Sequence, residues 1–133
     1  MREIAKVSRF ASPAAKAKVL IVACLKSSEE FVDTNGTRWG ALDLAACCEN
    51  MLLEATALGL GGVWLGVYPD KGRVSRISCY LGCEDDLVPF AVLAFGWPAT
   101  AQKKKRESTL RKKLETHVVY FNRESEVSYA EKT

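Results

Sequence analysis

The sequence predicts a single domain that contains both helices and strands. Its 133 residues are enough for one domain with a modest core, and 48% of them are hydrophobic. The apolar segments alternate between short β-branched runs and stretches with a helical period. In chain order they predict a strand, a helix, a strand, a helix and a strand, followed by a basic linker and a last strand.

The first strand is predicted at residues 18–25, with the sequence KVLIVACL. A short, apolar, β-branched run of this kind is typical of a strand that is covered on both faces. The polar stretch after it contains Asn35-Gly36, a pair that indicates a turn.

The longest helix is predicted from Trp39 to Leu58. Asp43, Asn50 and Glu54 stand seven and then four residues apart, so they share one narrow polar stripe. The rest of the helix is apolar nearly all round, which is typical of a helix at a domain centre or across a subunit interface. A chain of this length has little room to bury such a helix alone, so the pattern predicts an oligomer.

Several glycines follow this helix, in the stretch ATALGLGGVWLGVYPD at residues 55–70. Gly59 comes just after the last periodic residue, where a left-handed glycine commonly closes a helix, and a strand is predicted at 62–68. A dinucleotide-binding loop would instead follow a strand and open a helix, so that fingerprint is excluded. Gly66 lies inside the predicted strand and indicates either a bulge or a group that approaches the backbone closely.

The remaining elements are marked by caps and by apolar runs. Asp70 is a suitable N-cap for a short helix that ends at Gly82. A buried strand is predicted at 88–98, a basic linker at 100–115 and a C-terminal strand at 116–123, all within one domain of residues 1–133.

Charge and hydropathy limit the function classes. The net charge of +3 is too small to imply a nucleic-acid partner, although seven of the nineteen basic residues fall between Lys103 and Lys113. Aromatic residues that could stack on bases are not interleaved with this run, so a small nucleic-acid-binding protein is the least favoured function. The apolar runs are too short to cross a bilayer, and we expect no membrane partner.

The five cysteines form an odd number, and no signal peptide precedes them. Several lie within apolar periodic segments, as small core residues do, so we expect reduced thiols in a cytoplasmic protein. The sequence has no C-x-x-C pair and His117 is its single histidine, so we expect no metal site.

Three segments together resemble the nitroreductase family of flavoproteins. The first runs from Trp39 to Pro69 and contains Asp43, Asn50 and the glycine-rich stretch. The second is LVPFAVLAFGWPA at 87–99, and the third is HVVYFNR at 117–123. The match extends from about Val19 to Arg123, in order and with compatible spacing.

The resemblance implies an α+β fold, in which a mixed central sheet is flanked by helices, and an intertwined homodimer with FMN in the groove between subunits. It also implies that NAD(P)H reduces FMN and that the reduced flavin passes electrons to a nitroaromatic, a quinone or a similar small-molecule acceptor. The flavin carries this chemistry, so we expect no catalytic side chain from the protein.

The resemblance also implies the residues that bind the cofactor. It places Leu65, Gly66 and Val67 beside the flavin, with the amides of Gly66 and Val67 near the N5 edge of the ring. Lys104 and Arg106 match a pair that reaches the FMN phosphate, although Lys103, Lys105 or Arg111 could serve instead. A plain bulge at Gly66 and a solvated basic linker are the structural alternatives.

The family's N-terminal portion has no counterpart before Val19. Neither an Arg-Arg-Ser-x-Arg stretch nor a Gln-Pro-Trp stretch occurs there. The alternative function is therefore a non-catalytic, dimeric remnant of a nitroreductase that binds flavin weakly or not at all.

Overall fold

The computed structural model describes residues 2–8, 11–98 and 118. The chain separates into two units, residues 1–100 and 101–133, and the described helices and strands all belong to the first. The predicted linker at 100–115, with Lys104 and Arg106, lies outside the described residues. So does the predicted strand at 116–123, apart from Val118.

The described sheet has three strands in the order β1-β3-β2, and both pairings are antiparallel. They are β1 (Val19–Lys26), β2 (Gly61–Gly66) and β3 (Leu87–Gly96), which confirms the three strands predicted before the linker. The central strand β3 is the most deeply buried. Because these pairings are antiparallel, the expected mixed sheet would require a strand beyond the described residues.

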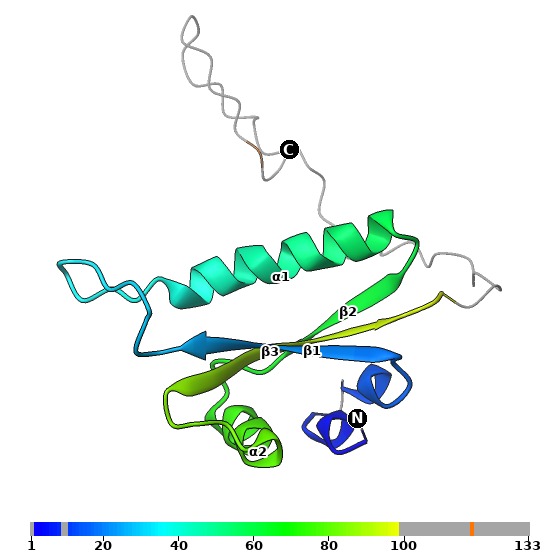
Figure 1. Cartoon of the computed structure of the whole chain (residues 1–133), viewed down its shortest axis with the longest axis horizontal. Coiled ribbons are helices and arrows are strands. Elements are labelled where there is room, and N and C mark those ends of the chain that lie inside the picture. The colour runs from blue at the N-terminus through cyan, green and yellow to red at the C-terminus, as the bar shows by residue number, and fades with distance from the viewer. Residues whose placement is uncertain (1, 9–10, 99–117, 119–133) are drawn as a thin grey trace, which may run out of the picture. The chain divides into compact units, whose positions relative to one another are not determined.

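Helical elements cover both faces of the sheet, which confirms the α+β fold (Figure 1). The helix α1 (Gly40–Ala57) connects β1 to β2 across one face. The helix α2 (Lys71–Leu81) lies on the other face, together with two 3₁₀ turns, η1 (Ile4–Lys6) and η2 (Ser12–Ala15). Within the described residues, no helix is long and apolar enough to cross a membrane.

Both helices end as the sequence predicts. The amide of Gly59 donates to the carbonyl of Thr56, and the amide of Leu60 donates to the carbonyl of Ala55, a pair of bonds that closes α1. Gly59 has φ of 75° and Gly82, at the end of α2, has φ of 66°, both left-handed conformations that favour glycine. The glycines after α1 therefore close a helix and begin a strand, as expected.

A separate apolar cluster fills each face of the sheet. Leu65, Val67 and Ile77 belong to the cluster under α2, whereas Cys48 and Leu93 belong to the cluster under α1. Successive β3 side chains alternate between the two clusters, as the pleat of a strand requires.

A β-bulge interrupts this alternation in β3. Ala23 pairs with Ala91 but Cys24 pairs with Pro89, so Phe90 is the extra residue of β3. The bulge turns the Phe90 side chain into the cluster beneath α1.

The sequence predicts α1 at a domain centre or across a subunit interface, and the isolated chain excludes the first alternative, because Leu42 and Leu53 are each 60% exposed on the face away from the sheet. The expectation for β1 is wrong in the isolated chain. β1 is not covered on both faces, because Val19 and Ile21 are also exposed. β1 is an edge strand of the described sheet, and α1 packs over one side of the sheet without covering these residues.

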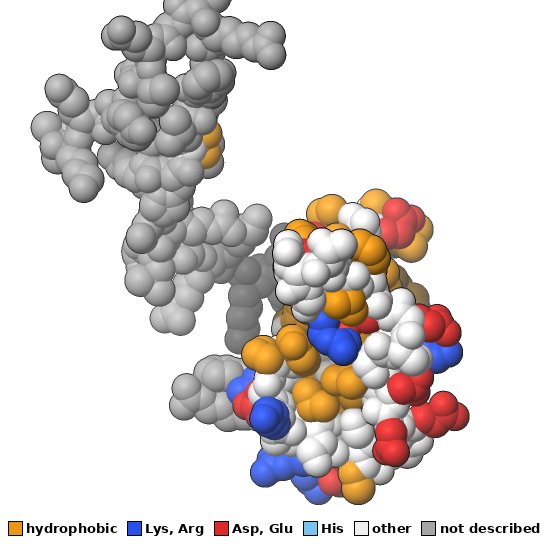
Figure 2. Space-filling view, turned by 90° about the vertical axis from the view of Figure 1, so that its left-hand side faces the viewer, with side chains coloured by type: hydrophobic (Ala, Val, Ile, Leu, Met, Phe, Trp, Pro, Cys, Tyr) orange, Lys and Arg blue, Asp and Glu red, His pale blue; other side chains and the backbone are white. Residues whose placement is uncertain are grey.

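The segment between β1 and α1 forms an ordered polar turn. The Asp33 carboxylate accepts hydrogen bonds from the amides of Asn35 and Thr37, and its other oxygen accepts from the Trp39 indole. These bonds, led by the one from Thr37, hold the pKa of Asp33 below its usual value. Phe31 beside this turn is exposed. Figure 2 shows the side of the molecule that lies on the left in Figure 1, and hydrophobic side chains are visible on it among charged ones.

Candidate functional site

The residues expected at the flavin meet at the end of β2. Leu65 and Val67 are buried in the cluster under α2, with 8% and 2% of their surface exposed. Their side chains pack in the core, and both residues also belong to the lining of a cavity along β2. Gly66 lies between them and is exposed.

The structure corrects the description of Gly66. Gly66 is the last residue of β2 rather than a mid-strand residue, because the strand ends there instead of at Tyr68. It pairs in register with Ala91 and is not among the glycines with positive φ. The bulge explanation is therefore wrong for Gly66, since the bulge of this sheet lies at Phe90.

The space above Gly66 is open. A Cβ at this position would meet no atom within 4 Å. Neither backbone strain nor packing within the described chain explains the glycine. The geometry therefore leaves room for a group from outside the described residues to approach the backbone.

The main chain of Gly66 faces the outer edge of the sheet. Its carbonyl oxygen accepts a hydrogen bond from Arg73 Nη1 at 3.0 Å. In a strand, the N–H and C=O of one residue point to the same side, so the Gly66 amide also points away from β3. β2 has no further neighbour in the described sheet, so this amide lies at a free edge.

Arg73 is a site residue that the sequence analysis did not single out. It belongs to the first turn of α2, where the Asp70 carboxylate accepts a bond from its amide at 3.1 Å. Its Nε lies 3.3 Å from the other Asp70 oxygen. The N-cap Asp70 therefore holds the guanidinium beside Gly66. The predicted cap placed Arg73 in that first turn, but the contact with β2 depends on the tertiary fold.

Aromatic side chains surround this end of β2. The Phe90 ring lies 5.9 Å from the rings of both Trp64 and Tyr68, measured between centroids. Trp64 and Tyr68 stand two residues before and after Gly66. Aromatic walls with a few polar main-chain groups are typical of sites that bind planar ring ligands.

A cavity of about 240 Å³ lies along β2 on the α2 face of the sheet; Trp64 belongs to its lining, whereas Phe90 and Tyr68 do not. Its walls come from the N-terminal turns, β2 and α2, and Gly66 and Arg73 belong to its lining. Its apolar lining includes Ile4, Val7, Ala11, Leu65 and Ile77.

These features fit the ring of a flavin. An exposed amide at Gly66 could stabilise negative charge at the ring, and the missing side chain leaves space for it. Arg73 adds a positive charge beside the same residue. Lys104 and Arg106 lie outside the described residues.

The glycines of this α+β fold close a helix and begin a strand, which separates the fold from the dinucleotide-binding class, where a glycine-rich loop follows a strand and opens a helix. The model of the nitroreductase family matches residues 6–97 of this chain. The chain belongs to the nitroreductase family.

Curated relatives agree with this assignment. The chain is 33% identical over 99 residues to a Methanothermobacter thermautotrophicus protein named "Putative NADH dehydrogenase/NAD(P)H nitroreductase". The match covers 74% of this chain and 50% of that protein. The chain thus spans about half the length of the curated relatives that it matches.

Solved structures share the fold. The chain matches a Clostridium acetobutylicum protein named "Putative NADH Oxidase" with a TM-score of 0.68 and 29% identity, over 76% of this chain and 58% of that one. A Bacteroides fragilis nitroreductase with bound FMN matches with a TM-score of 0.55 and 24% identity, over 90% of this chain and 59% of that one. The second likeness concerns the fold alone.

Proposed function

We propose that this chain carries part of the flavin site of an FMN-dependent oxidoreductase that passes electrons from NAD(P)H to a nitroaromatic, a quinone or a similar acceptor. The single observation that carries the proposal is the bare, outward-facing main chain of Gly66, with open space where a side chain would be. Membership of the nitroreductase family supports the proposal. The resemblance to this family implies an FMN ring beside Gly66, and that ring would fill the open space.

The chain's residues bind and orient, and the cofactor supplies the redox chemistry. FMN, when bound, accepts electrons from the nicotinamide and gives them to the acceptor. The amides of Gly66 and Val67 would donate hydrogen bonds to the ring, and Arg73 would hold the Gly66 peptide in place through its carbonyl. Lys104 and Arg106 would bind the phosphate.

The proposal includes a homodimer. The outer face of α1 carries an apolar stripe of Leu42, Ala46 and Leu53, whose members are all exposed in the isolated chain. Val19 and Ile21 of β1 add exposed apolar surface on the α1 face of the sheet. A second copy of the chain that packs on α1 would remove this surface from water.

A substitution at Gly66 tests the proposed site. Gly66→Val should fold as well as the parent, because its φ is not positive and its Cβ position is free. The valine would occupy the space proposed for the ring, so FMN affinity should fall by about tenfold or more. A thermal melt and an FMN fluorescence titration on the same sample measure both effects.

The matched control is Gly61→Val at the other end of β2. A Cβ there would make ordinary contacts, the nearest at 3.6 Å to the Gly96 carbonyl oxygen, so this variant should keep both stability and FMN affinity. If Gly66→Val kept the parent's FMN affinity, the proposed site would be wrong.

The alternative is a non-catalytic nitroreductase-like dimer that binds flavin weakly or not at all. It predicts a folded dimer with weak flavin binding at most. Failure of the parent chain to bind FMN at micromolar concentration would select this candidate.

A further inference from the structure

A cation stands at the free edge of β2, beside Gly66. Arg73 Nη1 donates to the Gly66 carbonyl oxygen at 3.0 Å, and the Gly66 amide points to the same side of the strand. The guanidinium therefore lies next to the main-chain donor that we propose for the flavin. Both residues also belong to the lining of the cavity along β2.

Two separate contacts fix the orientation of this guanidinium. Besides the bond from Nη1 to Gly66, its Nε lies 3.3 Å from Asp70 Oδ2. Asp70 is itself fixed, because its Oδ1 accepts a hydrogen bond from the Arg73 amide at the start of α2. A guanidinium has five N–H donors on three nitrogens, and Nη2 of Arg73 makes no hydrogen bond within the described residues. Nη2 is therefore available to a ligand at this edge.

The pair formed by Asp70 and Arg73 contributes little to the stability of the fold. Their side chains are 50% and 37% exposed, and water solvates both charges in the isolated chain. A planar ligand that lies over this edge would exclude part of that water. The two fixed charges would then act on the ligand through a less polar medium, where their effect is larger.

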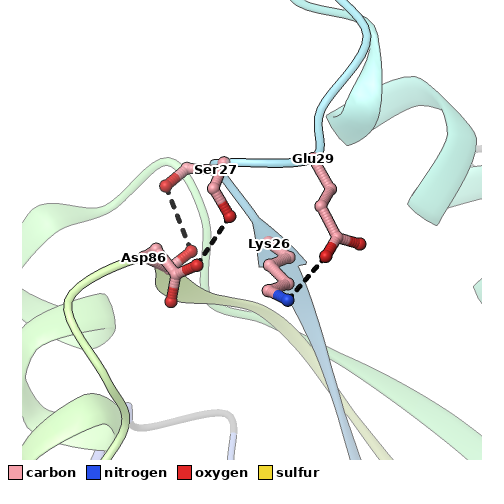
Figure 3. A network of polar contacts seen from close by, with 5 residues as sticks. Lys26, Ser27, Glu29 and Asp86 are labelled. Atoms are coloured by element: carbon pink, nitrogen blue, oxygen red, sulfur yellow. Dashed lines mark hydrogen bonds and ion pairs between the residues drawn. The ribbon is translucent and has the colours of Figure 1, made fainter.

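A second exposed ion pair of the same spacing lies at the end of β1. Lys26 Nζ lies 2.6 Å from Glu29 Oε1 (Figure 3). The neighbouring Ser27 hydroxyl donates to the Asp86 carbonyl, a contact that joins this end of β1 to the segment before β3. β1 and β2 form opposite edges of the described sheet, so the Lys26 pair is on the other edge from Gly66. It offers a matched control for the Asp70 pair.

We propose that Arg73 makes the site prefer reduced flavin over oxidised flavin, and that Asp70 limits this preference; the inference rests on the proposed function. A hydride from the nicotinamide brings two electrons and one proton, so the ring that accepts it gains one negative charge. The Arg73 guanidinium stabilises that charge, whereas the Asp70 carboxylate opposes it. The two side chains together set the reduction potential of the bound cofactor.

The test measures the affinity of the full chain for oxidised FMN and, under anaerobic conditions, for dithionite-reduced FMN. Arg73→Gln should weaken the binding of reduced FMN about tenfold more than that of oxidised FMN, which lowers the potential of the bound two-electron couple by about 30 mV. Asp70→Asn should shift the ratio of the two dissociation constants in the opposite direction, because asparagine still caps α2 but lacks the opposing charge. Arg73→Lys retains the positive charge and should keep most of the preference.

Controls separate this role from a structural one. Lys26→Gln removes the same charge from the pair on the other edge and should leave the ratio unchanged, and a thermal melt checks that each variant is folded. A parent chain that fails to bind FMN would overturn the proposed function and this inference with it. If the parent binds FMN, equal losses of both forms in Arg73→Gln, or shifts of the same sign in Arg73→Gln and Asp70→Asn, would overturn the role of Arg73 alone.

Discussion

Gly62 and Gly66 lie four residues apart on β2 and therefore on the same face of the strand, yet their surroundings differ. A Cβ at Gly62 would lie 2.7 Å from Leu52 Cδ2 and 2.9 Å from the Phe95 ring. At Gly66 the same direction is open. Close packing against α1 explains the first glycine, whereas the second has no packing reason within the described chain.

This contrast predicts that alanine destabilises the protein at Gly62 but not at Gly66. Gly62→Ala should lower the free energy of unfolding by about 1–3 kcal/mol, because the buried Phe95 ring cannot move freely away from the new methyl group. Gly66→Ala should leave it within about 0.5 kcal/mol of the parent. Urea unfolding of both variants measures the difference. Equal destabilisation would contradict the packing argument.

At the residue scale, sequence signals located glycines but could not say which were needed for packing. Gly59 and Gly82 were predictable, because each follows the last periodic residue of a helix. The contact between Arg73 and Gly66 was not, since it depends on how α2 returns to the end of β2.

At the scale of elements, the predicted strands and helices before residue 98 match the structure closely because their signals are local. Period, caps and turn residues place α1 and α2 within a residue or two of their observed bounds. The sequence analysis did not predict the bulge in β3 or the end of β2 at Gly66. Both features depend on how each strand pairs with its neighbour, which a local sequence pattern does not show. The candidate site lies at such a boundary.

The basic segment at 100–115 carries the next prediction. Replacing both Lys104 and Arg106 by alanine should weaken FMN binding at least about tenfold, because charge-assisted bonds to the phosphate are lost. Riboflavin, which lacks the phosphate, should bind almost unchanged. Parallel titrations with the two ligands measure this.

The matched control replaces both Lys112 and Lys113 by alanine, which removes the same number of positive charges from the same basic run. Its double alanine variant should keep the FMN affinity of the parent. Equal losses for FMN and riboflavin, or equal losses in the two double variants, would reject the assignment.

At the scale of the whole molecule, the sequence indicated a helix with more apolar surface than one small chain can bury. The structure shows where that surface lies, on the outer face of α1. The oligomer itself could not be derived from one chain, because the partner surface follows from symmetry and not from local pattern.

The proposed dimer predicts the effect of a charge on this face. Leu53→Lys should convert the dimer to a monomer, because it places a charge in the proposed interface. The monomer should stay folded, because Leu53 is 60% exposed in the isolated chain and lies outside its core. The control Leu81→Lys changes a 44% exposed leucine on α2 and should leave the dimer intact. Light scattering measures both. An unchanged mass for Leu53→Lys, or a monomeric parent, would contradict the proposed interface.

We propose above all that this chain binds FMN and promotes its reduction by NAD(P)H. Anaerobic mixing of FMN with the purified chain and NADH or NADPH, followed by visible absorbance, tests this. The flavin should be bleached faster with the parent chain than with NADH or NADPH alone, and Gly66→Val should remove the acceleration. Bleaching at the same rate with and without the chain would contradict the claim.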